Sequence, residues 1–450
     1  MPLPHPMNAF TPLRRRLLGA TGGAALLPLL LLCGFHMADE LDRVAFVTLG
    51  PEIRHTFGLT NKAFLAVVTI SNAVVIFGAL PMGRLADRYD RVRLSRAVAV
   101  LWAAGSVLVG VSPVLAVLVV GRLLGGLGRI AVEPLHAALL ADFYPGPTRP
   151  RVYAVHRLAA FLGLVGAPIG ALIAAVAGGP EGWRWAFGFL ALPTLVLIGV
   201  GRRLGDPGRH GSVLVEPMLV EPVSVEPAAP LGVVAALRVL AGLRTLRRLW
   251  LAALLFGAGA ASLPIFIGLF ADEALHLHVG ARSALNVGLG VAGLGGLALS
   301  SRYASRAVAR RDIPHLATLT GAAVAASGVA LIVAAPLPRA ASLVALLAAG
   351  LFAESFFPAY LPLVAEVAPA RLRSQAYASI ITAVGIGAIG IGIQVGALAD
   401  RAGSRVALAV LGGCITLGGL VVMSAKSAVA HDLSVAAGIR SQAGGSWLRT

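Results

Sequence analysis

Long apolar stretches alternate with short polar ones along most of this chain. Uninterrupted apolar runs such as Ala24 to Leu32, Val114 to Val120 and Leu343 to Leu351 lack the alternation of apolar and polar residues that transmembrane barrel strands show. Continuous runs are typical of membrane helices, which satisfy their backbone hydrogen bonds internally. The pattern therefore predicts an all-α membrane protein and excludes a membrane β-barrel.

The apolar runs and the polar loops between them predict twelve transmembrane helices in two sets of six. A span needs about 20 apolar residues, so this chain accommodates roughly a dozen spans with short loops. The first set is expected near 24–50, 60–83, 92–111, 114–141, 151–177 and 184–201. The second set is expected near 249–270, 283–300, 313–335, 340–363, 375–398 and 405–424.

This pattern divides the chain into two six-helix bundles, 24–201 and 249–424, with a cytoplasmic tail at each end, 1–23 and 425–450. Between the bundles, the linker 202–248 contains three Val-Glu-Pro repeats, which favour extended backbone. Its end, Leu231 to Arg248, mixes arginines with leucines and valines. Two interpretations stay open: a helix lying on an anionic membrane face, or a cytoplasmic extension of the seventh span.

Composition and charge fit this topology. Hydrophobic residues make up 58% of the 450 residues and charged residues 13%, while the formal net charge is +17. With both termini cytoplasmic, 26 of the 37 Lys and Arg residues fall in segments expected inside the cell and seven in segments expected outside. This asymmetry follows the positive-inside rule and explains the charge without nucleic acid. We expect a multi-pass protein of the plasma (cell inner) membrane.

Five ionisable residues interrupt the first predicted span: His36, Asp39, Glu40, Asp42 and Arg43. If the helix covers 24–50, they lie at mid-membrane, where a charge costs about 3 kcal/mol and needs a partner or water. Asp39 and Glu40 precede Arg43 by four and three residues, so either is able to pair with it on one helix face. The alternative is a short helix that ends near Met37 and leaves these residues in solvent.

The fourth predicted span carries a second charged group. Arg122, Arg129 and Glu133 are spaced by seven and four residues, which places them on one face of a continuous helix. Acids half-neutralised by arginines on cavity-lining helices are the usual build of a proton relay. We therefore expect Asp39, Glu40, Asp42 and Glu133 to couple protons, with Arg43, Arg122 and Arg129 as charge partners or substrate contacts.

The loop after the second span has a glycine, an aspartate four residues later, and basic residues five and eight residues after the glycine: Gly83, Asp87, Arg88 and Arg91. This spacing resembles the signature loop of the major facilitator superfamily. The resemblance implies two six-helix bundles that rock about a central site, with Asp87 facing a helix N-terminus near Ser374 in the opposite half. The matching segment of the second half, Gly295 to Arg302, lacks the aspartate, so we expect asymmetric gating.

Other motifs resemble the same family. Arg122 with Gly126 and Gly128 is similar to its fourth-helix pattern, and the fifth span carries an approximate glycine-proline motif expected to serve helix packing: Gly163, Gly166, Pro168 and Gly170. Leu41-Asp42-Arg43 looks like the spinster-like branch, whose members move lysolipids and similar amphiphiles. That branch has a glutamate directly after the fourth-helix glycines, where this chain has Arg129.

Several remaining polar residues in the spans are expected either to line a substrate cavity or to make packing hydrogen bonds: Asn72, His136, His156, Glu354, Tyr360 and Gln394. We expect no cofactor and no metal. The glycine-rich 121–128 lacks the lysine of a phosphate-binding loop, and only two cysteines, far apart, are present. His276 and His278 beside two acids leave open an outer metal site, with a solvated loop as the alternative.

These features predict a secondary transporter rather than an enzyme, expected to be a monomer that handles a small-molecule substrate, protons and lipid. The main hypothesis is export of an amphipathic or hydrophobic compound, drug-like or lysolipid-like, in exchange for protons. Asp42, with Asp39 and Glu133, would take up a proton and release its arginine partner. The alternatives are a symporter for an organic anion or metabolite and, less favoured, a membrane protein that transports nothing.

Overall fold

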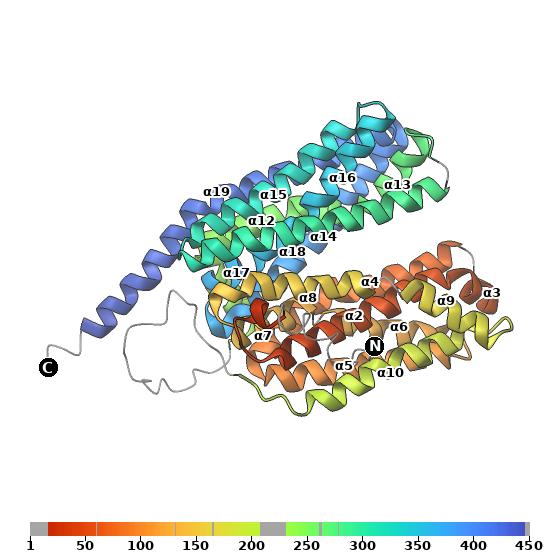
Figure 1. The fold of residues 1–450 in the computed structure, drawn as a ribbon, viewed down its shortest axis with the longest axis horizontal. Coiled ribbons are helices and arrows are strands. Elements are labelled where there is room, and N and C mark those ends of the chain that lie inside the picture. The colour runs from red at the N-terminus through yellow and green to blue at the C-terminus, as the bar shows by residue number, and fades with distance from the viewer. Residues whose placement is uncertain are drawn as a thin grey trace, which may run out of the picture. The chain divides into compact units, whose positions relative to one another are not determined.

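The computed structural model describes residues 17–59, 61–130, 132–163, 166–207, 231–260, 263–277 and 279–445, and all regular secondary structure among them is helical. The chain divides into two units, 1–78 with 89–208 and 79–88 with 209–450. Figure 1 labels the helices of both. The short segment 79–88, at the end of the second predicted span, groups with the second unit.

Unit 1 contains the helices expected in the first bundle, several of them in pieces. Their bounds are α2 (Leu26–Thr48), α3 (Gly50–Phe57), α4 (Asn61–Arg88, of which 79–88 group with unit 2), α5 (Arg91–Gly110), α6 (Leu115–Ile130), π-helix η2 (Val132–Ala137), α7 (Ala138–Phe143), 3₁₀ turn η3 (Gly146–Thr148), α8 (Arg149–Gly163), α9 (Gly166–Ala177) and α10 (Trp183–Gly201).

Unit 2 contains the second set. Its helices are α11 (Val233–Gly242), α12 (Arg244–Ala260), α13 (Leu263–Glu273), α14 (Val279–Ala309), α15 (Ile313–Ala334), α16 (Arg339–Ser355), α17 (Phe357–Val367), 3₁₀ turn η4 (Ala370–Leu372), α18 (Arg373–Ala402) and α19 (Ser404–Gly445). The tenth predicted span is broken at Phe356, which is followed by Pro358, whose ring disfavours a continuous helix.

Eight helices among the described residues are long and apolar enough to cross a membrane by length and composition. The four predicted spans missing from that set are 24–50, 60–83, 151–177 and 249–270. In the first of them, α2 has sufficient length at 23 residues but contains four charged side chains. In the last two, the helices α8 and α9 and the helices α12 and α13 are separated by residues outside the described ranges.

Helix α2 lies at the centre of unit 1. It packs against α8, α9 and α10 and also contacts α5 and α6. A hydrophobic core with Phe46, Phe64, Trp183 and Phe187 surrounds its second half. Because neighbours cover α2 on several sides, its polar residues have to find partners within unit 1.

In unit 2, α15 packs along α19, and α12 packs between α18 and α19. The core there is apolar, with Phe270, Leu331, Leu346 and Leu411 fully or almost fully buried.

The predicted cytoplasmic tail 425–450 differs in the structure, because α19 runs on to Gly445 and is the long blue helix near the C-terminus in Figure 1. Ala425, Ala428 and Val429 remain buried at helical spacing, so one face continues to pack although the hydropathy falls. The Asp432 carboxylate accepts hydrogen bonds from the backbone N–H groups of Arg244 and Thr245 at 3.2 and 2.8 Å. It caps the start of α12, where four N–H groups lack partners within the helix.

The segment with two open interpretations, Leu231 to Arg248, contains a separate helix and the start of another, while the position of that separate helix on a membrane face stays a prediction. A separate short helix, α11, ends at Gly242, and α12 begins at Arg244. Arg244, Arg247 and Arg248 therefore extend the seventh predicted span, while Val233 to Gly242 forms its own helix against α12 and α18.

Candidate functional site

The acidic residues of the first predicted span lie inside unit 1. Asp39 and Asp42 are buried, with 7% and 2% of their surfaces exposed, and Glu40 is half-buried. Helix α2 continues unbroken to Thr48, so the alternative of a short helix ending near Met37 is wrong. Buried carboxylates of this kind need a cation or several hydrogen bonds.

Of the three acids of α2, Asp42 is paired with the most deeply buried arginine. Arg122 of α6 approaches it with Nη1 to Oδ2 at 2.7 Å, and the hydroxyl of Ser106 on α5 donates to Oδ1 at 2.7 Å. The Arg122 guanidinium also lies 4.1 Å above the ring of Phe46. Three helices therefore converge on one carboxylate, and the cation that balances it is held by an aromatic face as well.

The other two acids of α2 have different partners. Arg129 of α6 lies near Asp39, with Nε to Oδ2 at 3.5 Å. Glu40 forms an ion pair with Arg43 one turn along α2, which is one of the two pairings that the spacing allows. The side chain of Glu133 lies outside the described residues. Its predicted place on one face with Arg129 stays a prediction, and Glu133 falls in the π-helix that follows α6.

Three buried histidines lie together beside these acids. The ring centroids of His36 on α2 and His156 on α8 are 4.7 Å apart, and those of His156 and His136 on η2 are 5.5 Å apart. The Nδ1 atom of His36 lies 3.2 Å from the backbone oxygen of His156. Sequence reasoning named His136 and His156 as candidates for a substrate cavity; the structure places both in the interior of unit 1.

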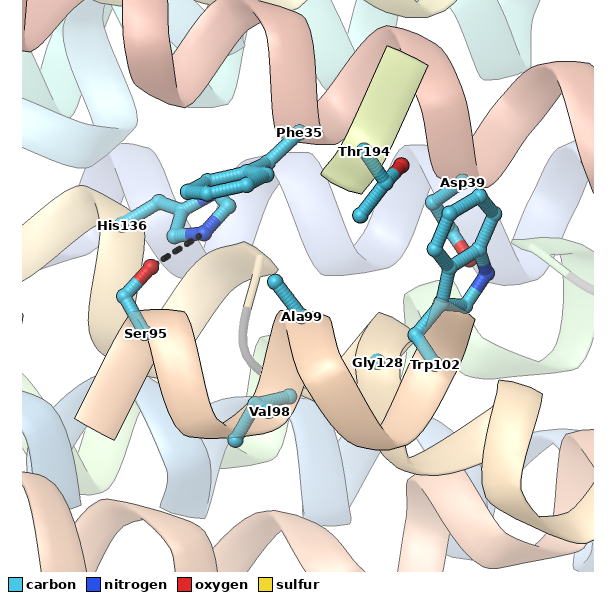
Figure 2. A pocket seen from close by; sticks show the side chains of 9 residues that line it. All are labelled: Phe35, Asp39, Ser95, Val98, Ala99, Trp102, Gly128, His136 and Thr194. Carbon is cyan, nitrogen blue, oxygen red and sulfur yellow. Dashed lines mark hydrogen bonds between the residues drawn. The ribbon is translucent and has the colours of Figure 1, made fainter. Parts of the chain in front are cut away.

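A small cavity adjoins Asp39 within unit 1, as Figure 2 shows. Helices α2, α5, α6 and α10 and the π-helix η2 contribute to it, and its nine lining residues are Phe35, Asp39, Ser95, Val98, Ala99, Trp102, Gly128, His136 and Thr194. Gly128 permits the close approach of Trp102, because a Cβ atom there would lie 2.7 Å from the indole.

The predicted glycine-proline packing motif lies partly within the described residues. A Cβ atom on Gly163 would lie 2.5 Å from the Glu40 Cβ, and one on Gly170 would lie 2.9 Å from the Ala45 Cβ. These two glycines allow α8 and α9 to approach α2 closely. The side chain of Pro168 and the surroundings of Gly166 lie outside the described residues.

The predicted gating residues have defined contacts. Within unit 2, Asp87 accepts hydrogen bonds from the backbone N–H groups of Ser374 and Gln375, at 3.2 and 2.9 Å, at the start of α18. Gly83 also lies close to this turn, because its Cβ would be 2.7 Å from that of Ala378. Within unit 1, Arg91 forms a fully buried ion pair with Asp142 of α7. Arg88 is exposed.

The remaining candidates are more scattered. Glu354 is half-buried at the end of α16, and Tyr360 is buried, with its ring 5.8 Å from that of Phe356. Gln394 is exposed, while the Asn72 side chain lies outside the described residues. Of the two loop histidines, His276 is exposed and His278 lies outside the described residues. Within the described ranges, no three His, Cys, Asp or Glu side chains are placed so that they could hold a metal ion together.

Sequence reasoning did not single out several residues that the structure places beside the expected ones: Ser106, Phe46, Asp142 and Thr194. Ser106 carries no sequence signal beyond being a small polar residue in an apolar span. Asp142 had a signal, since Ala141-Asp142 and Arg149 recur 224 residues later as Ala365-Glu366 and Arg373. A comparison of the two halves would have found it.

A family model described as Major Facilitator Superfamily matches residues 29–390. The glucose transporter GlcP of Staphylococcus epidermidis is 29% identical over 136 residues, which are 29% of each chain. The quinolone resistance protein NorB of Staphylococcus aureus is 28% identical over 131 residues, 29% of this chain and 27% of that protein. The alignments thus span less than a third of these two relatives.

Among solved structures, the proton:xylose symporter XylE matches with a TM-score of 0.67 and 15% identity, covering 89% of this chain and 95% of that one. A bacterial homologue of Spinster matches with a TM-score of 0.55 and 16% identity, covering 90% and 97%. Likeness at such identities shows the fold alone, and it does not specifically support the spinster-like branch that Leu41-Asp42-Arg43 suggested.

Proposed function

Because this chain belongs to the major facilitator superfamily, whose members are transporters and not enzymes, we propose that it exports an amphipathic or hydrophobic small molecule in exchange for protons. The observation that carries this proposal is the buried contact of Asp42 with Arg122 and Ser106. A carboxylate held by one arginine in a membrane helix is able to exist in two states, paired with the cation or protonated and released from it.

The proposed cycle follows from this two-state contact. Proton uptake by Asp42 removes the negative charge that holds Arg122, so the contact between α2 and α6 weakens. Asp39 with Arg129 forms a second pair of the same kind about one turn away along α2, and it is looser and less enclosed. We assign Asp42 to the coupling step and Asp39 to proton delivery, with proton entry from the outer side and both termini in the cytoplasm.

The second candidate function is symport of an organic anion or metabolite. It draws support from the similarity to a glucose transporter and to a proton:xylose symporter, and from the same arginines acting as ligands for an anion. Export draws support from the similarity to a quinolone resistance protein and from the apolar character of the spans.

Proteoliposomes that enclose a pH-sensitive dye test both candidates. Ethidium, lysophosphatidylcholine and glucose serve as probes, each added outside under zero membrane potential. We expect inward movement of ethidium or lysophosphatidylcholine to drive protons out, and the Asp42→Asn variant to lose this proton movement at least tenfold while probe-for-probe exchange persists. Protons moving with glucose in the same direction would favour symport. Proton movement with none of the probes, or an unchanged Asp42→Asn variant, would overturn the proposal.

A further inference from the structure

The cavity beside Asp39 is a polar space inside unit 1. Four of its lining side chains are polar: Asp39, Ser95, His136 and Thr194. It has space for about one water molecule. In the view of Figure 2, Thr194 lies between His136 and Asp39, with Ala99 and Val98 of α5 along the same wall. A water in this position has several polar partners within one cavity.

Two of these polar side chains have atoms that the protein leaves without a partner. Among the described residues, Nδ1 of His136 and Oγ1 of Thr194 are buried and meet no hydrogen-bonding protein atom. Both side chains are more than nine-tenths buried. Buried polar atoms in folded proteins are almost always hydrogen-bonded to protein or to ordered water. Since both residues line the same small cavity, one water is able to serve both.

The other ring nitrogen of His136 faces away from this unmet atom. Its Nε2 lies 3.4 Å from the hydroxyl of Ser95, the contact dashed in Figure 2. Ser95 lies about one helical turn after Arg91, the first residue of α5. Polar groups therefore extend from Asp39 in the middle of α2 towards the start of α5, the end of unit 1 that the sequence places at the cytoplasm.

We propose that this cavity holds a water molecule bound by Thr194, and that the water, His136 and Ser95 carry protons between Asp39 and the start of α5. Protonated Asp39 gives its proton to the water, which passes one of its own to Nδ1 of His136. The imidazole releases the proton on Nε2 to the Ser95 hydroxyl, which passes its own proton to solvent water at the start of α5. The water and Ser95 each regain the proton that they gave, the ring ends as its other tautomer, and one proton moves in total from Asp39 to solvent.

Charged groups near the path act on Asp39 in opposite senses. Arg129 pairs with Asp39, while Glu40 and Asp42 flank Asp39 on α2. From α8, the His156 ring contacts His136, and from α2 the His36 ring contacts His156. Arg122 of α6 pairs with Asp42. The arginine beside Asp39 stabilises its ionised form, whereas burial and the two neighbouring acids stabilise its protonated form, so the carboxyl group is held by opposing effects.

The pathway rests on the proposed proton coupling, but its experiment does not depend on transport. The purified parent protein in liposomes of phosphatidylcholine is taken through a rapid pH jump, and the carboxyl band of Asp39 is followed by time-resolved infrared spectroscopy. Its absence in Asp39→Asn assigns the band. We expect this band to change at least tenfold more slowly in His136→Gln than in the parent, because glutamine still reaches Ser95 but does not exchange a proton at neutral pH.

Thr194→Val gives a second test, because valine keeps the shape of the side chain and replaces the hydroxyl with a methyl group. We expect the Asp39 carboxyl band to change severalfold more slowly in this variant. Thr320→Val in unit 2 is the matched control, since Thr320 is equally buried with an unmet hydroxyl yet lies on α15, outside this cavity. It should leave the rate unchanged.

Parent-like rates in both His136→Gln and Thr194→Val would overturn the pathway, and so would a pH-insensitive Asp39. If His136→Gln does not fold, Thr194→Val alone decides. The two proposals can fail separately. If the Asp39 band changes more slowly in these variants but no probe drives proton movement in the parent, the pathway is retained and the transport proposal is rejected.

Discussion

The two units bury charge in different places. In unit 1, Asp39, Asp42 and Arg122 are buried in the middle of helices. In the described part of unit 2, buried charges occur at the ends or beginnings of helices, as in Glu366 and Arg373, or at the cap that Asp432 forms on α12. The middles of its helices bury serines and threonines, and Glu354 is only half-buried.

At one helix junction, by contrast, the two units are built alike. Arg149 donates to the backbone oxygen of Ala141 through Nη2 at 2.7 Å, and Arg373 donates to that of Ala365 at 3.0 Å. The Tyr153 and Tyr377 hydroxyls each donate to a carbonyl 16 residues earlier. Arginines here satisfy the free carbonyls at a helix C-terminus. The feature present in both units is thus architectural, while the mid-helix buried charges of unit 1, which apart from the capping Asp432 have no counterpart among the described residues of unit 2, are the candidates for function.

The largest expected effect comes from breaking the buried ion pair between Asp42 and Arg122, which has no counterpart in the middle of a helix among the residues of unit 2 that the structure describes. Arg122→Leu leaves Asp42 buried without its cation, and breaking a buried pair in this way costs about 3 to 5 kcal/mol. We expect the folded yield and the thermal stability to fall sharply. In the double variant Asp42→Leu with Arg122→Leu, folding should recover because no buried charge is left unpaired, while proton-coupled transport should stay absent. A double variant that transports like the parent would reduce the pair to a structural role.

An intermediate effect is expected from the feature that the units share. Arg149→Gln and Arg373→Gln each remove charged hydrogen bonds to helix-end carbonyls, at a cost of about 2 kcal/mol. Thermal unfolding should show similar losses for both, and the transport rate per folded molecule should change little. Markedly unequal losses would show that the two junctions are not equivalent in energy, however similar their geometry.

The smallest expected effect comes from changing the two aspartates that cap helices in unit 2, Asp87 and Asp432. Asp87→Asn and Asp432→Asn each keep the side-chain shape but remove the charge near a helix N-terminus, which is worth about 1 kcal/mol. We expect similar small decreases in thermal stability. Transport should change in Asp87→Asn alone, since the sequence predicts a gating role for that residue and none for Asp432. Parent-like transport in both would show that Asp87 serves only as a cap.

The junction comparison also bears on the expected asymmetry of gating. Ser374, whose N–H group binds Asp87, corresponds by the 224-residue spacing to Pro150, which has no N–H group to donate. The segment of the second half that matches the Asp87 loop, Gly295 to Arg302, contains no aspartate. The sequence has therefore lost the acceptor at one position and the donor at the other, which agrees with an asymmetric arrangement.

How far the sequence predicts the structure depends on the range of each interaction. Hydropathy predicted the helices because membrane burial acts on every residue of a span. Spacing predicted the Glu40–Arg43 pair because its members share one helix. It was not able to predict that Arg122 pairs with Asp42 or Arg129 with Asp39, because those contacts depend on how α2 packs on α6. The extension of α19 was missed since hydropathy falls there while the buried face continues.

The π-helix η2 makes the exact number of residues in this segment important. A π-helical turn contains one residue more than an α-helical turn, and such turns often accompany functional sites. It begins after Arg129, whose partner is on α2, and contains His136, whose partner is on α5. Deleting a residue here would relax the turn to an α-helix and rotate one side against the other by about 100°. Both contacts then no longer form together, so this segment should tolerate substitution far better than any change in its number of residues.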